Sequence, residues 1–325
     1  MESVGVIMKR IISSVLVTVV AFGFSALVQA RDCERDCLIK LSDDYVAAMV
    51  AHNPKLVPFS RNVRMVENLK KIKPGEGLWQ TAAAGPDKFV IHVPDPVSQQ
   101  VGYMAVLTEN VDGKPTPVEL GLRLKLENGK ITEAESIVVR NLTEANLAKH
   151  LQTPRLPLIS PVPEPYRDSR SRLLYIGASY YDALDNNNGA LAPFADDCVR
   201  YENGGQSTRN PVPTGKAEGF AYLGSLGCAA QIDTNAFEYI THIDNRRVWI
   251  ADTVNGLTFG LSHFRHAFTK HDFRVYGIPG ETTRHMQYDP FDMPAMHIYK
   301  IWGGKIHEIE AVGIVTPYMS PTGWE

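Results

Sequence analysis

The chain has 325 residues, of which 33 are Lys or Arg and 36 are Asp or Glu, for a formal net charge of −3. This balance has no strongly basic excess and argues against a nucleic-acid partner. The length that follows an N-terminal targeting segment fits two domains of about 100–200 residues.

The first thirty residues have the features of an export signal. Lys9 and Arg10 precede an apolar run from Ile11 to about Val28, and Val28-Gln29-Ala30 is a small-x-small cleavage site. A retained membrane anchor is the alternative, because the run reaches the low end of spanning length. We expect cleavage after residue 30, no membrane span in the mature chain, and a secreted or periplasmic protein.

Residues 38–52 have the three-or-four spacing of a helix, which ends at Asn53-Pro54. Antiparallel strands are then predicted at 89–93, 101–108, 118–127 and 130–140. Residues 31–150 are therefore a predicted first domain. Residues 151–167 contain five prolines and predict an extended linker.

The remaining residues, 168–325, repeat this order as a second domain. A helix is predicted at 171–184 and loops at 204–226 and 266–293. Strands are predicted at 247–252, 257–264, 296–302 and 305–314. Helices followed by runs of antiparallel strands are typical of the α+β class.

Sequence blocks recur in the same order in both predicted domains. Tyr45, Pro58, Phe59, Glu67 and Asn68 recur 135 residues later as Tyr180, Pro193, Phe194, Glu202 and Asn203. Gly-Lys-Ile-x-Glu-x-Glu at 129–135 recurs 175 residues later, at 304–310. This pattern predicts an internal duplication, with the 40 extra residues of the second copy between its Glu-Asn pair and its last strands.

The four cysteines are even in number, and an exported protein meets an oxidising environment. Of the three possible pairings we favour Cys33–Cys37 and Cys198–Cys228, because each stays within one copy. A zinc site is the alternative, but no Cys-x-x-Cys spacing is present.

The Tyr-x-x-Ala of both helices, the Pro-Phe…Glu-Asn blocks and the Gly-Lys-Ile-x-Glu hairpins resemble the NTF2-like superfamily, and most closely its SnoaL-like branch. The resemblance implies two fused cone-shaped domains, each with a cavity between helices and a bent antiparallel sheet. It implies no single activity, because members include cofactor-free isomerases, cyclases, dehydratases, hydrolases and lyases, and others only bind. Sheets of this superfamily commonly pair, which implies a homo-oligomer or pairing of the two copies within the chain.

Seven of the ten histidines lie between residues 242 and 307. Strand alternation places His263 on one face with Leu257, Phe259 and Leu261, and His297 on one face with Tyr299 and Ile301. We expect both histidines to face a cavity and to transfer protons there, because imidazole titrates near neutral pH. The first copy has apolar residues at or near Val106 and Leu122 instead. The alternative is that both are hydrogen-bonded core histidines.

Other candidates complete this site. Tyr180 and Arg200 are expected to stabilise developing negative charge, and Asp252 to orient a histidine or, alternatively, to cap a turn. The expected substrate-binding residues are Trp249, Phe259, Tyr299, Glu202 and Asn203. His263-x-x-His266, with His271, Asp272 and His285, is the alternative metal cluster. We predict no metal there, because the first two would point to opposite faces of a strand.

These features predict a cofactor-free lyase, dehydratase or isomerase acting on a small apolar molecule, and the resemblance implies an aromatic, lignin-derived diaryl or polyketide-like compound. A periplasmic binding module with the same pocket and no chemistry is one alternative. An adhesion or assembly protein is another, and it predicts no cavity of ligand size in the second copy.

Overall fold

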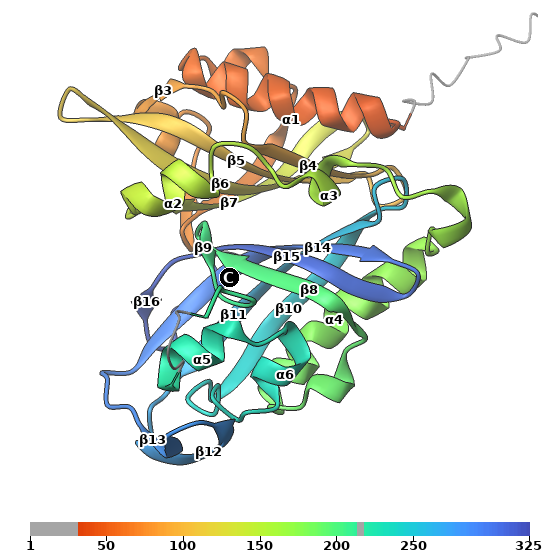
Figure 1. Ribbon diagram of the computed structural model, residues 1–325. Helices are drawn as coiled ribbons and strands as arrows, with labels where there is room; N and C mark the ends of the chain where they lie inside the picture. Colours follow the sequence, from red (N-terminus) through yellow and green to blue (C-terminus); the bar gives the residue numbers. More distant parts are fainter. Residues whose placement is uncertain (1–31, 213–217) are drawn as a thin grey trace, which may run out of the picture. The chain divides into compact units, whose positions relative to one another are not determined.

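The computed structural model describes residues 32–212 and 218–325 (Figure 1). The predicted export signal lies outside the described residues. Within them, no helix is long and apolar enough to cross a membrane. The described chain is α+β and contains two large mixed sheets, one formed by residues of each predicted copy.

The N-terminal half, residues 32–150, begins with helix α1 (Arg35–Val50). Its sheet has the order β2-β1-β7-β6-β5-β3, with β4 paired to β5. The strands are β1 (Phe59–Glu67), β2 (Lys70–Ile72), β3 (Ala82–Ala84), β4 (Val90–Asp95), β5 (Gln100–Val111), β6 (Lys114–Glu127) and β7 (Lys130–Val139). Short helical turns lie at η1 (Pro54–Leu56) and η2 (Gly77–Gln80), and α2 (Glu144–Lys149) follows the sheet.

The C-terminal half, residues 168–325, begins with helix α4 (Arg170–Asp185) and turn η4 (Gly189–Leu191). Its sheet has the order β9-β8-β15-β14-β11-β10, with β16 paired to β14. The strands are β8 (Phe194–Glu202), β9 (Gly205–Gln206), β10 (His242–Asp252), β11 (Leu257–His266), β14 (Phe291–Trp302), β15 (Lys305–Gly313) and β16 (Thr316–Pro317). Helices α5 (Gly219–Ser225) and α6 (Cys228–Ile232) and a separate hairpin, β12 (Asp272–Ile278) with β13 (Glu281–His285), complete this half.

The recurring sequence blocks mark recurring structure. Helices α1 and α4 have 16 residues each, and strands β1 and β8 have nine, at the same shift of 135. Asn68 and Asn203 both have positive φ, 47° and 48°. Each asparagine side chain accepts from the N–H and donates to the carbonyl of one residue, Val138 of β7 for Asn68 and Gly313 of β15 for Asn203. The asparagine of the Glu-Asn block therefore has the same structural role in both halves, and we call it the asparagine fastener.

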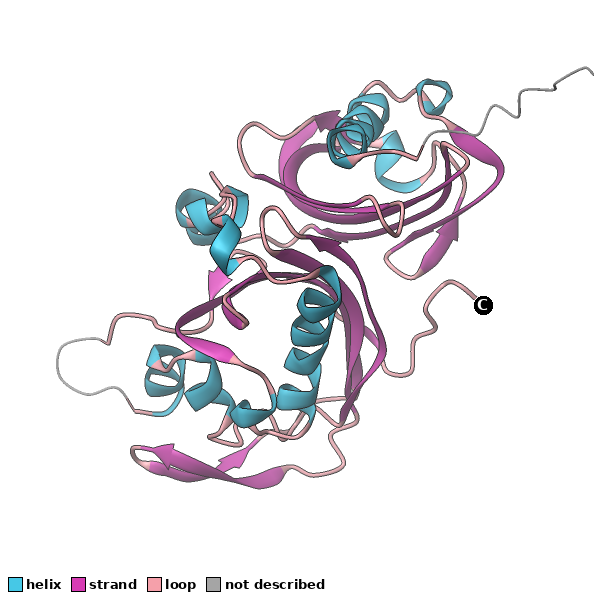
Figure 2. Cartoon of the chain, turned by 90° about the vertical axis from the view of Figure 1, so that its right-hand side faces the viewer, coloured by secondary structure: helices cyan, strands magenta, loops and turns pink. Residues whose placement is uncertain are grey.

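Three apolar cores stack through the molecule, and Figure 2 shows each sheet bending around its helices. The first core joins α1 to one face of the N-terminal sheet, and the second joins α4 to one face of the C-terminal sheet. The third lies between the two sheets and contains Ile91 and Met104 from one and Phe259 and Ile298 from the other. The C-terminal sheet is thus covered on both faces.

The predictions for three segments without regular secondary structure are wrong. Residues 266–293 contain the β12–β13 hairpin, and residues 204–226 contain β9 and α5. The Pro-rich residues 151–167 form α3 (Leu156–Ile159) and η3 (Glu164–Tyr166) instead of an extended linker. Leu158 is fully buried there, and Arg155 pairs with Glu308 and Glu310, so this segment packs on the C-terminal sheet.

The close approach of the sheets gives a stability test. A Cβ at Gly102 would lie 2.4 Å from the Phe259 ring, whereas a Cβ at Gly85 meets nothing within 4 Å. We expect Gly102→Ala to lower the free energy of unfolding by about 1–3 kcal/mol, because overpacking forces neighbours out of place. Urea unfolding measures this, with Gly85→Ala as the matched control. Equal stability of the two variants would contradict the packing between the sheets.

Candidate functional site

A cavity of about 100 Å³ lies inside the C-terminal half, between α4 and its sheet. Alternate residues of two strands face it, Phe264 and His266 from β11 and Met293, Ala295 and His297 from β14. Helix α4, strand β8 and the segment 237–240 supply the remaining walls. An engineered apolar cavity of about 150 Å³ binds benzene, so this space is close to the size of one six-membered ring. The assembly-protein alternative predicted no such cavity.

Arg200 places a buried positive charge on the cavity wall. Its side chain is 3% exposed and donates to Gln231 Oε1 at 2.6 Å and to the Tyr180 hydroxyl at 3.4 Å. Its Nε lies 3.0 Å from Glu202, a carboxylate whose side chain is half exposed. The guanidinium carbon lies 5.1 Å from the centre of the Phe237 ring. An apolar wall and a partly screened guanidinium together favour a ring compound with an oxygen that carries negative charge.

His297 is a neutral imidazole at physiological pH. Burial, together with the positive charge of Arg200, lowers its pKa to about 3. Its Nδ1 lies 3.2 Å from the hydroxyl of Tyr181 on α4. Burial raises the pKa of Tyr181 to about 12, so that hydroxyl keeps its proton and can donate to Nδ1 or accept from Nδ1–H, according to the tautomer of the ring. In the tautomer with its proton on Nδ1, Tyr181 accepts from that N–H and Nε2 is free to take up a proton.

Tyr180 is the second donor on the cavity wall. Burial raises its pKa to about 12, although Arg200 acts in the opposite direction. Its ring lies 5.6 Å from His297 and 5.3 Å from Tyr299, centre to centre. Helix α4 presents Tyr180 and Tyr181 side by side to the sheet, so that one contacts Arg200 and the other contacts His297.

Aromatic side chains stack against His266, which lines the cavity. The His266 ring stacks on Phe291 at 4.3 Å and on Tyr239 at 5.6 Å. Burial lowers the pKa of His266 to about 4, and its Nδ1 has no hydrogen-bonding partner within residues 32–212 and 218–325. His266 is thus a second neutral imidazole at this cavity.

The expectation that His263 shares the cavity with His297 is wrong. His263 lies on the opposite face of the sheet with Leu261 and Phe259, which belong to the core between the two sheets. The space beside His263 is only about 10 Å³. Phe259, expected to bind substrate, is buried in that core and does not line the cavity.

Asp252 and Trp249 also lie away from the cavity. Asp252 pairs with Arg35 at 2.8 Å and accepts a hydrogen bond from the N–H of Val254, so it fastens α1 and caps a turn. The Trp249 side chain is 46% exposed and lines a different cleft, beside Arg247. Neither residue is placed to orient a histidine or to contact a molecule in the cavity.

The remaining predicted residues lie at or behind the cavity wall. Glu202 and Asn203 line it, but both polar groups of the Asn203 side chain are engaged with Gly313. Tyr299 is fully buried and stacks on His297 at 5.8 Å, on the side of α4. No group of three or more His, Cys, Asp or Glu residues in the described parts of the chain is arranged to hold a metal ion.

Both predicted disulfides are present, Cys33–Cys37 and Cys198–Cys228. The second joins β8, which carries Arg200, to α6, which carries Gln231. Sequence reasoning missed Tyr181, Gln231, Phe237, Tyr239 and the place of His266. The adjacent Tyr180-Tyr181 pair was a usable signal, since neighbouring helical residues can both face a curved sheet. Gln231 and residues 237–240 carried no comparable signal.

The comparisons with known proteins describe only part of this chain. A family model described as a domain of unknown function, DUF8021, matches residues 166–313, which is less than half of the chain. No curated protein matches the chain.

Two solved structures share 18% and 14% sequence identity with this chain, each with a TM-score of 0.24. One is a hypothetical protein with a ketosteroid isomerase-like fold from Catenulispora acidiphila, where the match covers 30% of this chain and 83% of that one. The other is an NTF2-like protein of unknown function from Cytophaga hutchinsonii, with 31% and 88% covered. Scores this low do not decide the family.

The depressed pKa of His297 predicts how stability changes with pH. The unfolded chain takes up a proton on this residue near pH 6.5, whereas the folded chain does so only near pH 3. Stability is therefore lost as the pH falls from about 6.5 towards about 3, at about 1.4 kcal/mol per pH unit. We expect wild type to lose about 2 kcal/mol more than His297→Gln between pH 6.5 and 5. Urea unfolding at both pH values measures this difference, and equal losses would show that the folded protein protonates His297 normally.

Proposed function

We propose that the cavity of the C-terminal half binds a single-ring molecule with a carbonyl or phenol oxygen and catalyses proton transfer on it without a cofactor. The observation that carries this proposal is the placement of Arg200, Tyr180 and His297 on one enclosed wall. The cavity volume favours one ring over the lignin-type diaryl or polyketide-like molecules considered from the sequence, which need the cavity to open further.

A comparison with the N-terminal half supports this proposal, because the equivalent positions there carry apolar side chains. At the position of Arg200 it has Met65, and at the position of His297 it has Leu122, both buried in its core. Tyr45 replaces Tyr180 and accepts a hydrogen bond from the buried indole of Trp79 at 3.2 Å. Charge and imidazole were thus introduced at positions where the other half has apolar side chains. Burying a charge is costly, which favours a functional reason for keeping it.

The proposed chemistry is removal of a proton next to the ring oxygen. Arg200 and the protonated Tyr180 would hold that oxygen as it gains negative charge, an effect of about 3–4 kcal/mol per preorganised donor. His297 would accept the proton and return it at the same or another carbon. Its low pKa makes it a weak base in the free protein. The new negative charge beside Arg200 would offset the guanidinium and raise the basicity of His297 as the reaction proceeds.

Deuterium exchange tests this proposal. 2-Cyclohexenone is a one-ring ketone, and its exchange in D₂O is followed by mass spectrometry. We expect wild type to accelerate exchange, Tyr180→Phe to slow it by about 10²-fold, and His297→Leu to abolish it. Tyr45→Phe is the matched control, because it removes the equivalent hydroxyl from the other half, and we expect no change. Exchange by His297→Leu at the wild-type rate would refute the catalytic role.

A binding module without catalysis is the second candidate, and the pKa of about 3 at His297 favours it. It predicts that phenol binds and that 2-cyclohexenone shows no catalysed exchange. Calorimetric titration with phenol separates the two candidates. Arg200→Met, which copies Met65, should weaken phenol binding in both cases, because the hydrogen bonds from the guanidinium to the oxygen are lost.

We further propose that the chain is a tandem of two NTF2-like domains, 31–150 and 168–325, joined by residues 151–167 and exported after cleavage of residues 1–30. The repeated helix lengths, strand order and asparagine fasteners support the tandem. The two disulfides support export to the periplasm or beyond the cell, because such bonds persist in oxidising compartments.

A further inference from the structure

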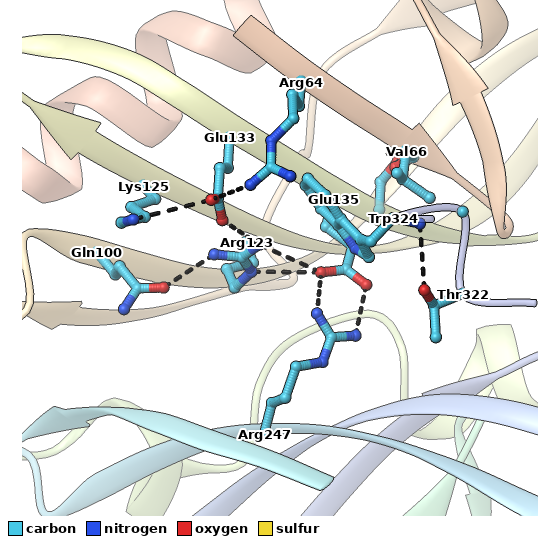
Figure 3. A network of polar contacts seen from close by, with 12 residues as sticks. Arg64, Val66, Gln100, Arg123, Lys125, Glu133, Glu135, Arg247, Thr322 and Trp324 are labelled. Carbon is cyan, nitrogen blue, oxygen red and sulfur yellow. Dashed lines mark hydrogen bonds and ion pairs between the residues drawn. The ribbon is translucent and has the colours of Figure 1, made fainter. Parts of the chain in front are cut away.

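An open cleft of about 520 Å³ lies between β10 and the N-terminal sheet, separate from the cavity described above. Its volume falls in the usual range for small-molecule sites, about 300–1,000 Å³. Figure 3 shows its floor, where Arg64, Arg123 and Lys125 come from the N-terminal sheet and Arg247 from β10. Two tryptophans, Trp249 and Trp324, also line it.

The guanidinium groups of the cleft are held rigidly. Arg123 is 1% exposed and donates to Gln100 at 3.0 Å, Glu133 at 2.9 Å and Glu135 at 3.3 Å. Arg247 forms two bonds of 2.6 Å to the two oxygens of Glu135 (Figure 3). These carboxylates fix the arginines in place, so a ligand would meet donors that are already ordered.

The charges of the cleft are largely paired. Arg64 and Arg123 share Glu133, and Arg123 and Arg247 share Glu135. Lys125 pairs with the half-exposed Glu127 at 2.9 Å. A further carboxylate, that of Glu325, accepts hydrogen bonds from Thr322, which also lines the cleft. The Arg64 side chain nevertheless remains 62% exposed, so its guanidinium presents a positive charge to solvent, which attracts an anion.

The indoles add flat apolar surface to this positive floor. The guanidinium carbon of Arg123 lies 5.5 Å from the Trp324 ring and 6.0 Å from the Trp249 ring, and that of Arg64 lies 5.0 Å from Trp324. Trp249 is 46% exposed, whereas Trp324 is less exposed. A half-exposed tryptophan beside ordered arginines is the combination that recognises a ring carrying an anionic group.

We propose that this cleft is a binding site for a ring-bearing carboxylate. The ring would pack on Trp249 and Trp324, and the carboxylate would accept hydrogen bonds from the exposed guanidinium of Arg64, with the buried charge of Arg123 behind it. The ring can be an aromatic acid or a sugar acid, since both offer a flat apolar face and the same anionic group. The site is distinct from the enclosed cavity and does not depend on the function proposed for it.

Tryptophan side-chain NMR tests this site directly. The chain has four tryptophans, Trp79, Trp249, Trp302 and Trp324, so four indole N–H signals are expected. We would titrate the protein at low salt with benzoate, with galacturonate and, as a neutral probe, with benzyl alcohol. We expect the signals of Trp249 and Trp324 to move saturably and those of Trp79 and Trp302 to stay. Benzyl alcohol should bind at least about 10-fold more weakly, because it cannot pair with the arginines.

Two exposed variants check which groups carry binding. Trp249→Ala and Arg64→Gln should each weaken binding by about 10-fold, and the solvent-exposed change Lys40→Gln on α1 should have no effect. A response to benzoate alone identifies an aromatic acid, and a response to galacturonate alone identifies a sugar acid. The proposal is overturned if neither anion shifts the two signals up to about 10 mM, if all four signals shift together, or if both variants bind as wild type.

Discussion

The packing of the two sheets against each other is the constraint on which the rest of the structure depends. Ile91 and Met104 on one side meet Phe259 and Ile298 on the other, and Gly102 leaves room for the Phe259 ring. Because this contact fills most of one face of the C-terminal sheet with apolar side chains, the cavity of that half lies on the other face, under α4. The same contact brings Arg247 of β10 to Glu135 of the N-terminal sheet and so creates the open cleft.

The cavity of the C-terminal half differs at a few positions from the corresponding apolar core of the N-terminal half. The two halves share a first helix, a parallel strand pair (β1–β7 and β8–β15) and the asparagine fastener. They differ where the C-terminal half has Arg200 and His297 and the N-terminal half has Met65 and Leu122. A buried guanidinium needs partners, and Gln231 supplies one at 2.6 Å. The disulfide from Cys198 to Cys228 holds α6, which carries Gln231, beside β8. Gln231 and the Cys198–Cys228 disulfide thus support the buried charge of Arg200, and the N-terminal half has no charged residue at the equivalent position.

The two candidate sites use arginine in different ways. In the cavity, Arg200 is buried beside a neutral imidazole and a tyrosine, so its field acts on an oxygen in surroundings that screen charge less than bulk water does. In the cleft, Arg64 lies next to solvent, where its field is screened, so the proposed ligand would also depend on stacking against tryptophan. The first arrangement suits a change in charge during a reaction, and the second suits recognition of a charge that is already present.

The sequence by itself predicted the α+β class, the favoured pairing of the cysteines, the recurring blocks and a shared site for Tyr180, Arg200 and His297. These followed from local signals: helical spacing, hairpin turns, repeat shifts and residue type. It did not determine which face of β11 lines the cavity, because every residue of that strand is buried and alternation then gives no inside or outside. Nor did it reveal that the Pro-rich segment packs or that Trp249 faces a cleft. Only the tertiary structure decided those points, because each depends on which distant strand covers a given face.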